Sequence, residues 1–315
     1  MIQQTTRAVS RADLGEAVHE YNLTGEGFIA SEILPVRPVK KKAATLSVIT
    51  RENLKRADAK HANGAGYNRV NLTAEDLAYA CVEYGLEGPL TDDDRENFAS
   101  DFDAELETVA DVENKLLTER EIRVAALVFN TTTWTGASLY TDNSGSPWDT
   151  ITTKIITQIA AAKEKVRLST GTKANALIIG EAAMQNLLIN TEIIGRFPGA
   201  TIVTEAMLRS QIASLFGLED LIVGGKAYDS AKEGQDFVAG DIWADDYAMV
   251  AKISKGSLND PGLGKTVLWE PLTSEIATVE EYREEQTKSD IYRVSHYLDE
   301  KIFDPYFAHL MKIDA

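Results

Sequence analysis

The sequence predicts an α+β fold, and three stretches of the chain carry that prediction. Residues 91–130 have the apolar spacing of one long helix, and residues 174–270 alternate short strands with short helices. Residues 276–297 alternate polar with apolar side chains, as two long antiparallel strands do. At 315 residues the chain has enough material for about two domains, with ample apolar residues for a core.

The stretch 91–130 is the longest regular element that the sequence predicts. Its apolar side chains recur at three- and four-residue steps, and no proline or glycine interrupts them. Thr91 to Asp94 are residue types that favour a helix N-terminus, and about 35 residues give a rod of ~50 Å. Twelve acidic side chains, Asp101 and Glu105 among them, stand against four basic ones. This acidic face is either a solvated surface or a docking surface.

Residues 36–69 have the opposite charge. They contain nine lysines and arginines, including Lys55, Arg56 and Arg69, against only two acidic residues. Two strand-like runs and a glycine-bearing turn at 61–66 predict an extended hairpin with little apolar surface to bury. Since a free hairpin is marginal in water, we expect it to pack on its own domain or on a neighbouring subunit. Tyr67 is its one aromatic residue, which favours an acidic protein partner over nucleic acid.

The second half of the chain has clear start and stop signals. Ser146-Pro147-Trp148 predicts a helix start, and Gly171 is placed as its C-terminal cap. Thr131–Trp134 reads as extended, and Thr204 as the cap of a helix over 205–216. Strands are expected near 175–179, 220–223, 244–253 and 266–269, then over 276–284 and 291–297 with a hairpin between, and 301–313 as a final strand or irregular tail. The long strands need a partner, for which the 91–130 helix is the natural choice.

Charge and composition limit the function. The net charge is −17, whereas proteins that grip nucleic acid present basic surfaces. The single cysteine, Cys81, permits no internal disulfide and indicates a reducing compartment. The N-terminus has no apolar core of signal-peptide type, and no apolar run reaches the length of a membrane span, so we expect no membrane association.

No catalytic, cofactor or metal site emerges from the sequence. Gly262–Thr266 ends like a phosphate-binding loop, but Asn259 replaces the first glycine and a strand pattern follows where a helix is required. The four histidines have no metal-ligand spacing, and no serine-nucleophile motif occurs. We therefore expect no enzyme and no cofactor. A nucleotide-dependent enzyme built around Lys265 remains the alternative from a different class.

The order of these segments resembles the major capsid proteins of tailed bacteriophages, which have the Hong Kong 97-type fold. The resemblance runs from about Gly27 to the C-terminus. It rests on several motifs in sequence: GFIASEILP at 27–35 before the basic hairpin, RVAALVFN at 123–130 ending the acidic helix, Trp148, GTKANALII at 171–179, LFGLE at 215–219 with LIVG at 221–224, and the closing strand pair. Each motif alone is weak evidence for the family, and their order along the chain is the feature specific to it.

The resemblance implies four regions. An N-terminal arm (1–35) precedes an E-loop (36–75), and a P-domain of long strands and a spine helix (about 91–130) takes residues 76–173 and 271–315. An α/β A-domain takes 174–270. In this family the E-loop lies over a neighbouring subunit, so we hypothesise that Lys55, Arg56 and Arg69 face acidic groups such as Asp101 and Glu105 of the adjacent P-domain.

The implied function is a structural subunit that self-assembles, as pentamers and hexamers, into the icosahedral head shell around phage double-stranded DNA. The implied partners are further copies, a separate scaffolding protein, a portal and a decoration protein, with DNA enclosed without sequence-specific binding. The implied location is the virion, assembled in the host cytoplasm. A nanocompartment shell protein of the encapsulin kind, which has the same fold, is the alternative within this class.

Overall fold

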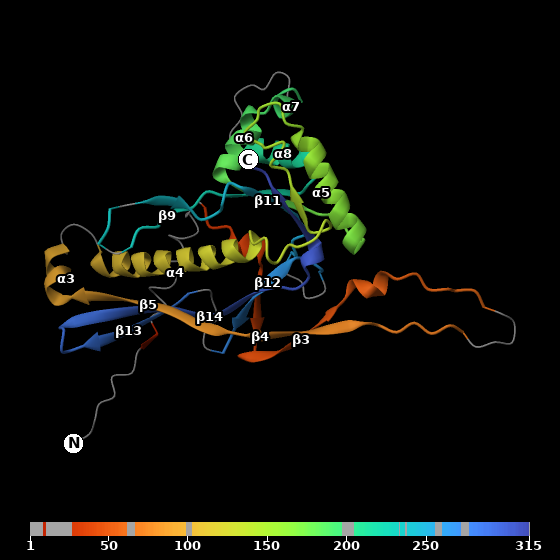
Figure 1. The fold of residues 1–315 in the computed structure, drawn as a ribbon. Helices are drawn as coiled ribbons and strands as arrows, with labels where there is room; N and C mark the ends of the chain where they lie inside the picture. The colour runs from red at the N-terminus through yellow and green to blue at the C-terminus, as the bar shows by residue number, and fades with distance from the viewer. Residues whose placement is uncertain are drawn as a thin grey trace.

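The computed structural model describes residues 9–10, 27–61, 67–98, 103–196, 205–232, 234–236, 238–255, 260–271 and 277–314. Two sheets organise the molecule, with a long helix lying along the first and a helical layer around the second (Figure 1). A two-stranded hairpin projects from the body on the side away from the long helix (Figure 1).

The six-stranded sheet forms the base of the molecule. Its order is β1-β13-β14-β12-β2, and β5 also pairs with β14. The bounds are β1 Val9–Ser10, β2 Val36–Val39, β5 Val82–Thr91, β12 Gly264–Trp269, β13 Thr278–Glu284 and β14 Ser289–Ile302. All pairs are antiparallel except β12 with β2. The predicted strand pair near 276–297 is confirmed, and its turn contains Lys288 at a left-handed φ of 49°.

The stretch 91–130 forms two helices, so the prediction of one uninterrupted helix was wrong. Helix α3 spans Asp92–Phe98 and α4 spans Ala104–Val128. Asp103 has extended backbone angles, and its side chain accepts hydrogen bonds from the amides of Glu105 (3.1 Å) and Leu106 (3.3 Å). A capping aspartate starts a new helix where the apolar spacing alone suggested continuity.

Helix α4 lies on the six-stranded sheet, the partner that the sequence predicted. Val109, Val112 and Leu116 are buried in one apolar cluster with Leu90 of β5 and with the sheet residues Val279, Tyr292 and Val294. Gly88 of β5 allows this close approach, because a Cβ there would lie 2.6 Å from a methyl group of Val112.

The five-stranded sheet forms the second layer, in the order β6-β15-β11-β7-β8. Its strands are β6 Tyr140–Asp142, β7 Ala176–Gly180, β8 Asp220–Gly224, β11 Tyr247–Ala251 and β15 Ala308–Lys312. Around it lie α5 Ile155–Thr170, α6 Glu181–Ile189, α7 Thr191–Ile194 and α8 Glu205–Phe216 (Figure 1). A separate two-stranded ribbon is formed by β9 (Ala227–Asp229) and β10 (Ala239–Asp241). The predicted α/β character of this part of the chain is confirmed.

Two local predictions in this layer need correction. Helix α5 begins at Ile155, not at Pro147, because residues 147–153 form turns in which Thr153 donates its hydroxyl to the Pro147 carbonyl. Residues 131–133 form a turn and not an extended segment. The cap at Gly171 is confirmed, with a left-handed φ of 72°. The predicted cap at Thr204 lies outside the described residues.

The chain end also takes a defined place. A short 3₁₀ turn, η2 (Pro305–Phe307), leads from β14 into β15. Strand β15 pairs with β11 and β6 in the five-stranded sheet. Hydrogen bonds thus join the last strand of the chain to the second layer. The boundaries of the four regions that the resemblance implies stay predictions.

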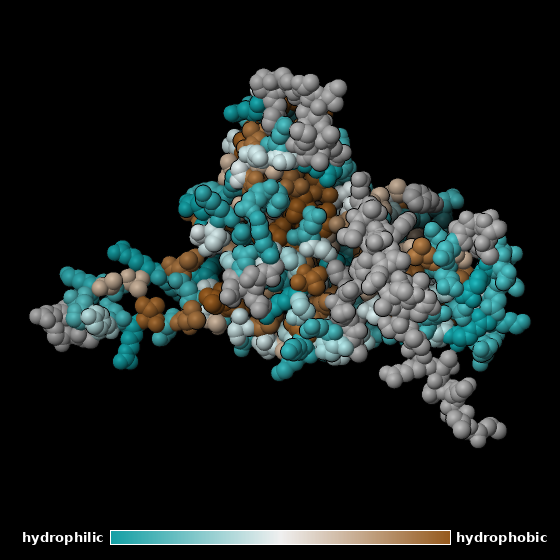
Figure 2. Space-filling view, turned by 180° about the vertical axis from the view of Figure 1, so that it is seen from behind, coloured by the Kyte–Doolittle hydropathy of each residue, from teal (hydrophilic) through white to brown (hydrophobic). Residues whose placement is uncertain are grey.

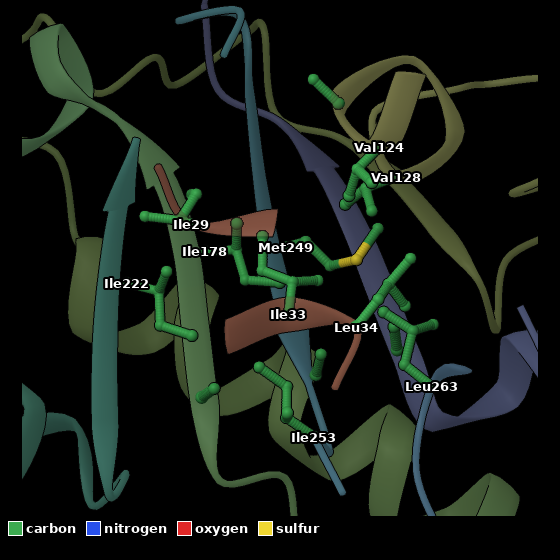
Figure 3. Packing of buried hydrophobic residues seen from close by; sticks show 14 of the residues in the cluster. Ile29, Ile33, Leu34, Val124, Val128, Ile178, Ile222, Met249, Ile253 and Leu263 are labelled. Atoms are coloured by element: carbon green, nitrogen blue, oxygen red, sulfur yellow. The ribbon is translucent and has the colours of Figure 1, made fainter. Parts of the chain in front are cut away.

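A short helix, α2 (Ala30–Ile33), lies where the layers meet. Ile29, Ile33 and Leu34 are buried against strands of the five-stranded sheet and against Val124 and Val128 of α4 (Figure 3). These side chains belong to the GFIASEILP motif, so the motif is a piece of the core and not an exposed arm. The burial joins the two layers immediately before the projecting hairpin.

Candidate subunit interface

The projecting hairpin is built from β3 (Ala43–Ile49) and β4 (Ala74–Ala80), paired antiparallel from Ala43 with Ala80 to Ile49 with Ala74. A 3₁₀ turn, η1 (Arg51–Leu54), follows β3. The predicted hairpin is confirmed, although the return strand begins at Ala74 and not at Tyr67. The turn η1 beyond the strand pair contacts its own subunit, because the Arg51 guanidinium lies 3.4 Å from the centre of the Tyr306 ring.

Asn53 closes the base of the outer loop. Its side-chain amide donates to the carbonyls of Thr50 (2.8 Å) and Thr73 (2.7 Å), and its oxygen accepts from the Thr73 amide (2.9 Å). These three bonds hold the two sides of the loop together beyond the end of the strand pairing. The residues further out therefore extend from a defined base.

The outer part of the hairpin exposes apolar side chains that single chains normally bury. Figure 2 shows these hydrophobic groups along the projection among hydrophilic ones. Tyr67 is 82% exposed, and the others range from 60% to 76%: Ile49, Leu54, Val70 and Leu72. Several exposed apolar residues on a thin projection indicate a surface that another molecule covers.

The three basic residues that the sequence singled out lie on this projection and are exposed. Lys55 pairs with Glu52 at 3.2 Å, and both side chains are largely solvent-accessible. Within the described ranges, neither Arg56 nor Arg69 makes an ion pair. An exposed i,i+3 pair contributes little to stability, so all three cations are available to an acidic partner.

The two acidic residues named from the sequence are not brought to these cations within one subunit. Asp101 lies outside the described residues. Glu105 lies on α4 and pairs with Arg95 at 3.0 Å, and Arg95 also pairs with Asp290 at 2.6 Å. Glu105 is thus partly neutralised by its own chain, which weakens its expected role.

A better acidic surface lies between α4 and β5. A groove of about 590 Å³ runs there, with Leu90 and Val112 in its apolar floor. Its rim carries four carboxylates: Glu87, Asp94, Glu107 and Asp111. In the described part of the chain Glu107 makes no ion pair, whereas Glu87 pairs with Arg293 at 2.7 Å and Asp111 pairs with Lys115, which also lines the groove, at 2.7 Å. Sequence reasoning missed this groove because Glu87 and Glu107 come together only when the strand packs on the helix.

The phosphate-loop reading of Gly262–Thr266 is wrong. Lys265 lies in β12, is 4% exposed and pairs in register with Lys301 of β14. The Thr266 amide donates to the Pro35 carbonyl, so it is not available to a phosphate. No helix N-terminus follows the glycines, and the anion site that such a loop requires is therefore not formed.

The remaining chemistry-bearing residues serve the fold. Burial raises the pKa of the Cys81 thiol to about 11, so this cysteine is not a nucleophile at neutral pH. Among the described residues, no group of three or more histidine, cysteine or acidic side chains is placed to hold a metal ion. None of the described helices has both the length and the apolar character to span a bilayer.

Sequence comparison finds relatives of one kind. The chain is 26% identical over 215 residues to the major capsid protein of Burkholderia phage BcepMu, covering 67% of each chain. It is 24% identical over 170 residues to the major capsid protein of Pseudomonas phage JBD67, covering 54% of this chain and 53% of that one. No family model matches.

Structural comparison gives the same fold over nearly the whole chain. A phage-related protein from Bordetella bronchiseptica RB50 matches with a TM-score of 0.74 at 20% identity, covering 97% of this chain and 98% of that one. The capsid of cyanophage P-SCSP1u matches with a TM-score of 0.58 at 13% identity, covering 99% and 90%. An encapsulin from Synechococcus elongatus PCC 7942 matches with a TM-score of 0.53 at 10% identity, covering 90% and 86%.

The two layers, the helix along the first sheet and the projecting hairpin define the Hong Kong 97-type fold, which the capsid of cyanophage P-SCSP1u shares. The encapsulin shares this fold, so the fold alone does not separate a virus head from a nanocompartment. In sequence the chain is similar to the major capsid proteins of two phages, which favours a virus head over a nanocompartment. The resemblance stated from the sequence is confirmed.

Proposed function

We propose that this protein is the structural subunit of an icosahedral phage head, and that its copies overlap through the projecting hairpin. The observation that carries the proposal is the projecting hairpin, which exposes five large apolar residues and three cations to solvent. A single chain gains nothing from such a projection. A shell of many copies gains a repeated contact that covers these residues.

The acidic groove between α4 and β5 is the seat that we assign to the hairpin of a neighbouring copy. Its apolar floor suits the exposed hairpin residues, and its carboxylate rim suits Lys55, Arg56 and Arg69. Glu107 and Asp111 therefore join Glu105 and Asp101 as candidate partners. Individual exposed ion pairs contribute only ~0–1 kcal/mol, so the contact depends on apolar burial and on repetition around the shell.

In this proposal the protein encloses double-stranded DNA without reading its sequence, and its role is structural and not enzymatic. A scaffolding protein, a portal and a decoration protein are its further proposed partners. Its proposed location is the virion, after assembly in the host cytoplasm. The phage relatives support this over the nanocompartment alternative, because both are major capsid proteins.

Charge reversal in the hairpin tests the proposal. Purified wild-type protein should form closed particles visible by negative-stain microscopy. The triple variant Lys55→Glu, Arg56→Glu, Arg69→Glu should remain folded by circular dichroism and form few or none. A control with the same charge change at exposed sites outside the hairpin, Lys154→Glu, Lys173→Glu, Lys232→Glu, should assemble better than the hairpin variant. Normal shells from the hairpin variant would refute the overlap.

A further inference from the structure

One carboxylate inside the protein joins three separate parts of the chain. Glu121 lies on α4 and is 1% exposed. Its Oε1 accepts hydrogen bonds from the Ile29 amide (2.9 Å) and from the indole N–H of Trp243 (2.8 Å). Its Oε2 accepts from the Ala30 amide (3.1 Å). The long helix, the segment that starts α2 and the loop that enters the five-stranded sheet therefore meet at one side chain.

This carboxylate is held by N–H donors and not by a cation. The neighbouring guanidinium of Arg120, 3% exposed, donates instead to Ser31 (2.8 Å) and Thr266 (3.4 Å). Burial raises the pKa of the Glu121 carboxyl, and the three donors offset that effect only in part. A buried acid is costly to keep, and one use of such groups is to specify a single arrangement of the parts around them.

The arrangement that Glu121 specifies is the relation between the two layers. Helix α4 packs on the six-stranded sheet, while Trp243 packs on the five-stranded sheet at Gly224. Trp243 also meets Phe129, just after the end of α4, with ring centroids 5.3 Å apart. The Trp243 indole thus touches α4 at two levels, through its N–H at Glu121 and through its ring at Phe129.

We propose that Glu121 is an interlayer latch, a positioning residue whose hydrogen bonds to Trp243, Ile29 and Ala30 fix the angle between the two sheets. The inference rests on the proposed function in one respect: in a shell, that angle sets the tilt between neighbouring copies and hence the particle diameter. One apolar cluster also spans the two layers, with Val124 and Val128 of α4 packed among residues of the five-stranded sheet. Such packing is non-directional, whereas the hydrogen bonds of the latch select one orientation.

Two substitutions separate the latch from the packing around it. Glu121→Ala removes all three acceptor contacts. Trp243→Phe keeps an aromatic ring over Gly224, removes the N–H that bonds Glu121 and reduces the size of the buried ring. The matched control is Glu119→Ala, which removes an exposed glutamate from the same helix. Trp243→Phe decides the question if Glu121→Ala does not fold.

The angle is measured in the unassembled subunit by double electron–electron resonance between spin labels at Asp111→Cys on α4 and Ala161→Cys on α5. Both sites are exposed, whereas the native Cys81 is 3% exposed, so the spin label should not react with it. The wild-type and Glu119→Ala backgrounds should give one narrow distance peak. Glu121→Ala and Trp243→Phe should give a peak at least twice as broad or a shifted one. Unchanged peaks in both would overturn the latch.

Particle diameter supplies the second readout. Glu121→Ala and Trp243→Phe should give shells with a wider spread of diameters than wild type in electron micrographs, and Glu119→Ala should match wild type. A purely stabilising role would lower the melting temperature and leave both diameter and label distance unchanged. If wild-type protein forms no particles, the proposed function fails, while the label distances still decide the latch.

Discussion

The imidazole Nε2 of His309 on β15 lies 2.8 Å from the hydroxyl oxygen of Thr141 on β6, the edge strand of the five-stranded sheet. The other ring nitrogen lies 2.9 Å from the Ser138 carbonyl, which can only accept, so Nδ1 carries the proton and Nε2 accepts from Thr141. The Thr141 hydroxyl in turn accepts from Lys165. The hydrogen-bond network therefore accommodates a neutral histidine, and burial together with the nearby Lys165 charge disfavours the protonated ring.

Acid should weaken the fold through this residue. Burial lowers the pKa of His309 to about 4 from its ordinary 6.5. The unfolded chain therefore takes up a proton at this site below pH 6.5, while the folded chain does not until about pH 4. Stability falls across that window by about 3 kcal/mol at most, at ~1.4 kcal/mol for each unit of pKa shift.

Urea unfolding of the unassembled subunit at pH 7.0 and pH 4.5 measures this effect. The variant His309→Gln, which has no titrating ring, should lose less stability between the two pH values than wild type, although its stability at pH 7 is lower. Acidic residues titrate in both proteins, so the comparison isolates the histidine. Equal losses in the two proteins would contradict the assignment.

Gly224 should tolerate no side chain. A Cβ at this position would lie 2.2 Å from the Trp243 ring, so Gly224→Ala forces the indole or the strand to move. We expect a loss of about 1–3 kcal/mol in the free energy of unfolding, the usual cost of overpacking a core. Gly145→Ala is the control, because a Cβ there meets no atom within 4 Å, and it should stay within about 0.5 kcal/mol of wild type.

Asn53 should control the order of the outer hairpin. Asn53→Ala removes three hydrogen bonds at the base of the loop and disturbs no buried residue. Trypsin should therefore cleave the hairpin several-fold faster, while the melting temperature of the body changes little. Asn68→Ala is the comparison, because among the described residues its side chain makes one hydrogen bond, to the Asp58 carbonyl. Equal cleavage rates in wild type and Asn53→Ala would show that the clamp is unimportant.

The seat of the hairpin can be tested by exchanging charges. If Lys55 and Arg56 face Glu107 and Asp111 of a neighbour, then Lys55→Glu with Arg56→Glu should impair assembly, and adding Glu107→Lys with Asp111→Lys should restore part of it. Particle yield by light scattering is the measurement, at about 0.1 M salt, where the screening length is ~10 Å. A quadruple variant no better than the hairpin double variant would place the seat elsewhere.

Local signals predicted much of the fold, because their physical causes are local. The alternation in 276–297 follows from one face of a sheet meeting a helix, and Gly171 ends α5 because a left-handed residue must stand there. Where a local signal competed with another, prediction failed. Asp103 caps a new helix within the stretch for which one continuous acidic helix was predicted. Pro147 lies in a turn, although Ser146 and Trp148 beside it predicted a helix start.

One side of the candidate interface could be predicted from local signals, and the other side could not. The basic hairpin was visible in sequence, since charge clustering along 36–69 needs no tertiary information. The acidic groove that we propose as its seat was not visible, because Glu87 of a strand and Glu107 of a helix line one groove only after packing. The acidic residues of the long helix also differ in burial: Glu113 and Glu121 are buried, whereas Glu107 and Glu119 are exposed.

By itself, the sequence determined the fold class, the charged projection and the resemblance to phage head proteins, because residue periodicity and charge are properties of the chain. Only the tertiary structure decided that GFIASEILP is core, that Lys265 belongs to a strand and that Glu121 meets Trp243. These relations depend on residues far apart in sequence, such as 29, 121 and 243, and only packing brings their donors and acceptors within hydrogen-bond distance.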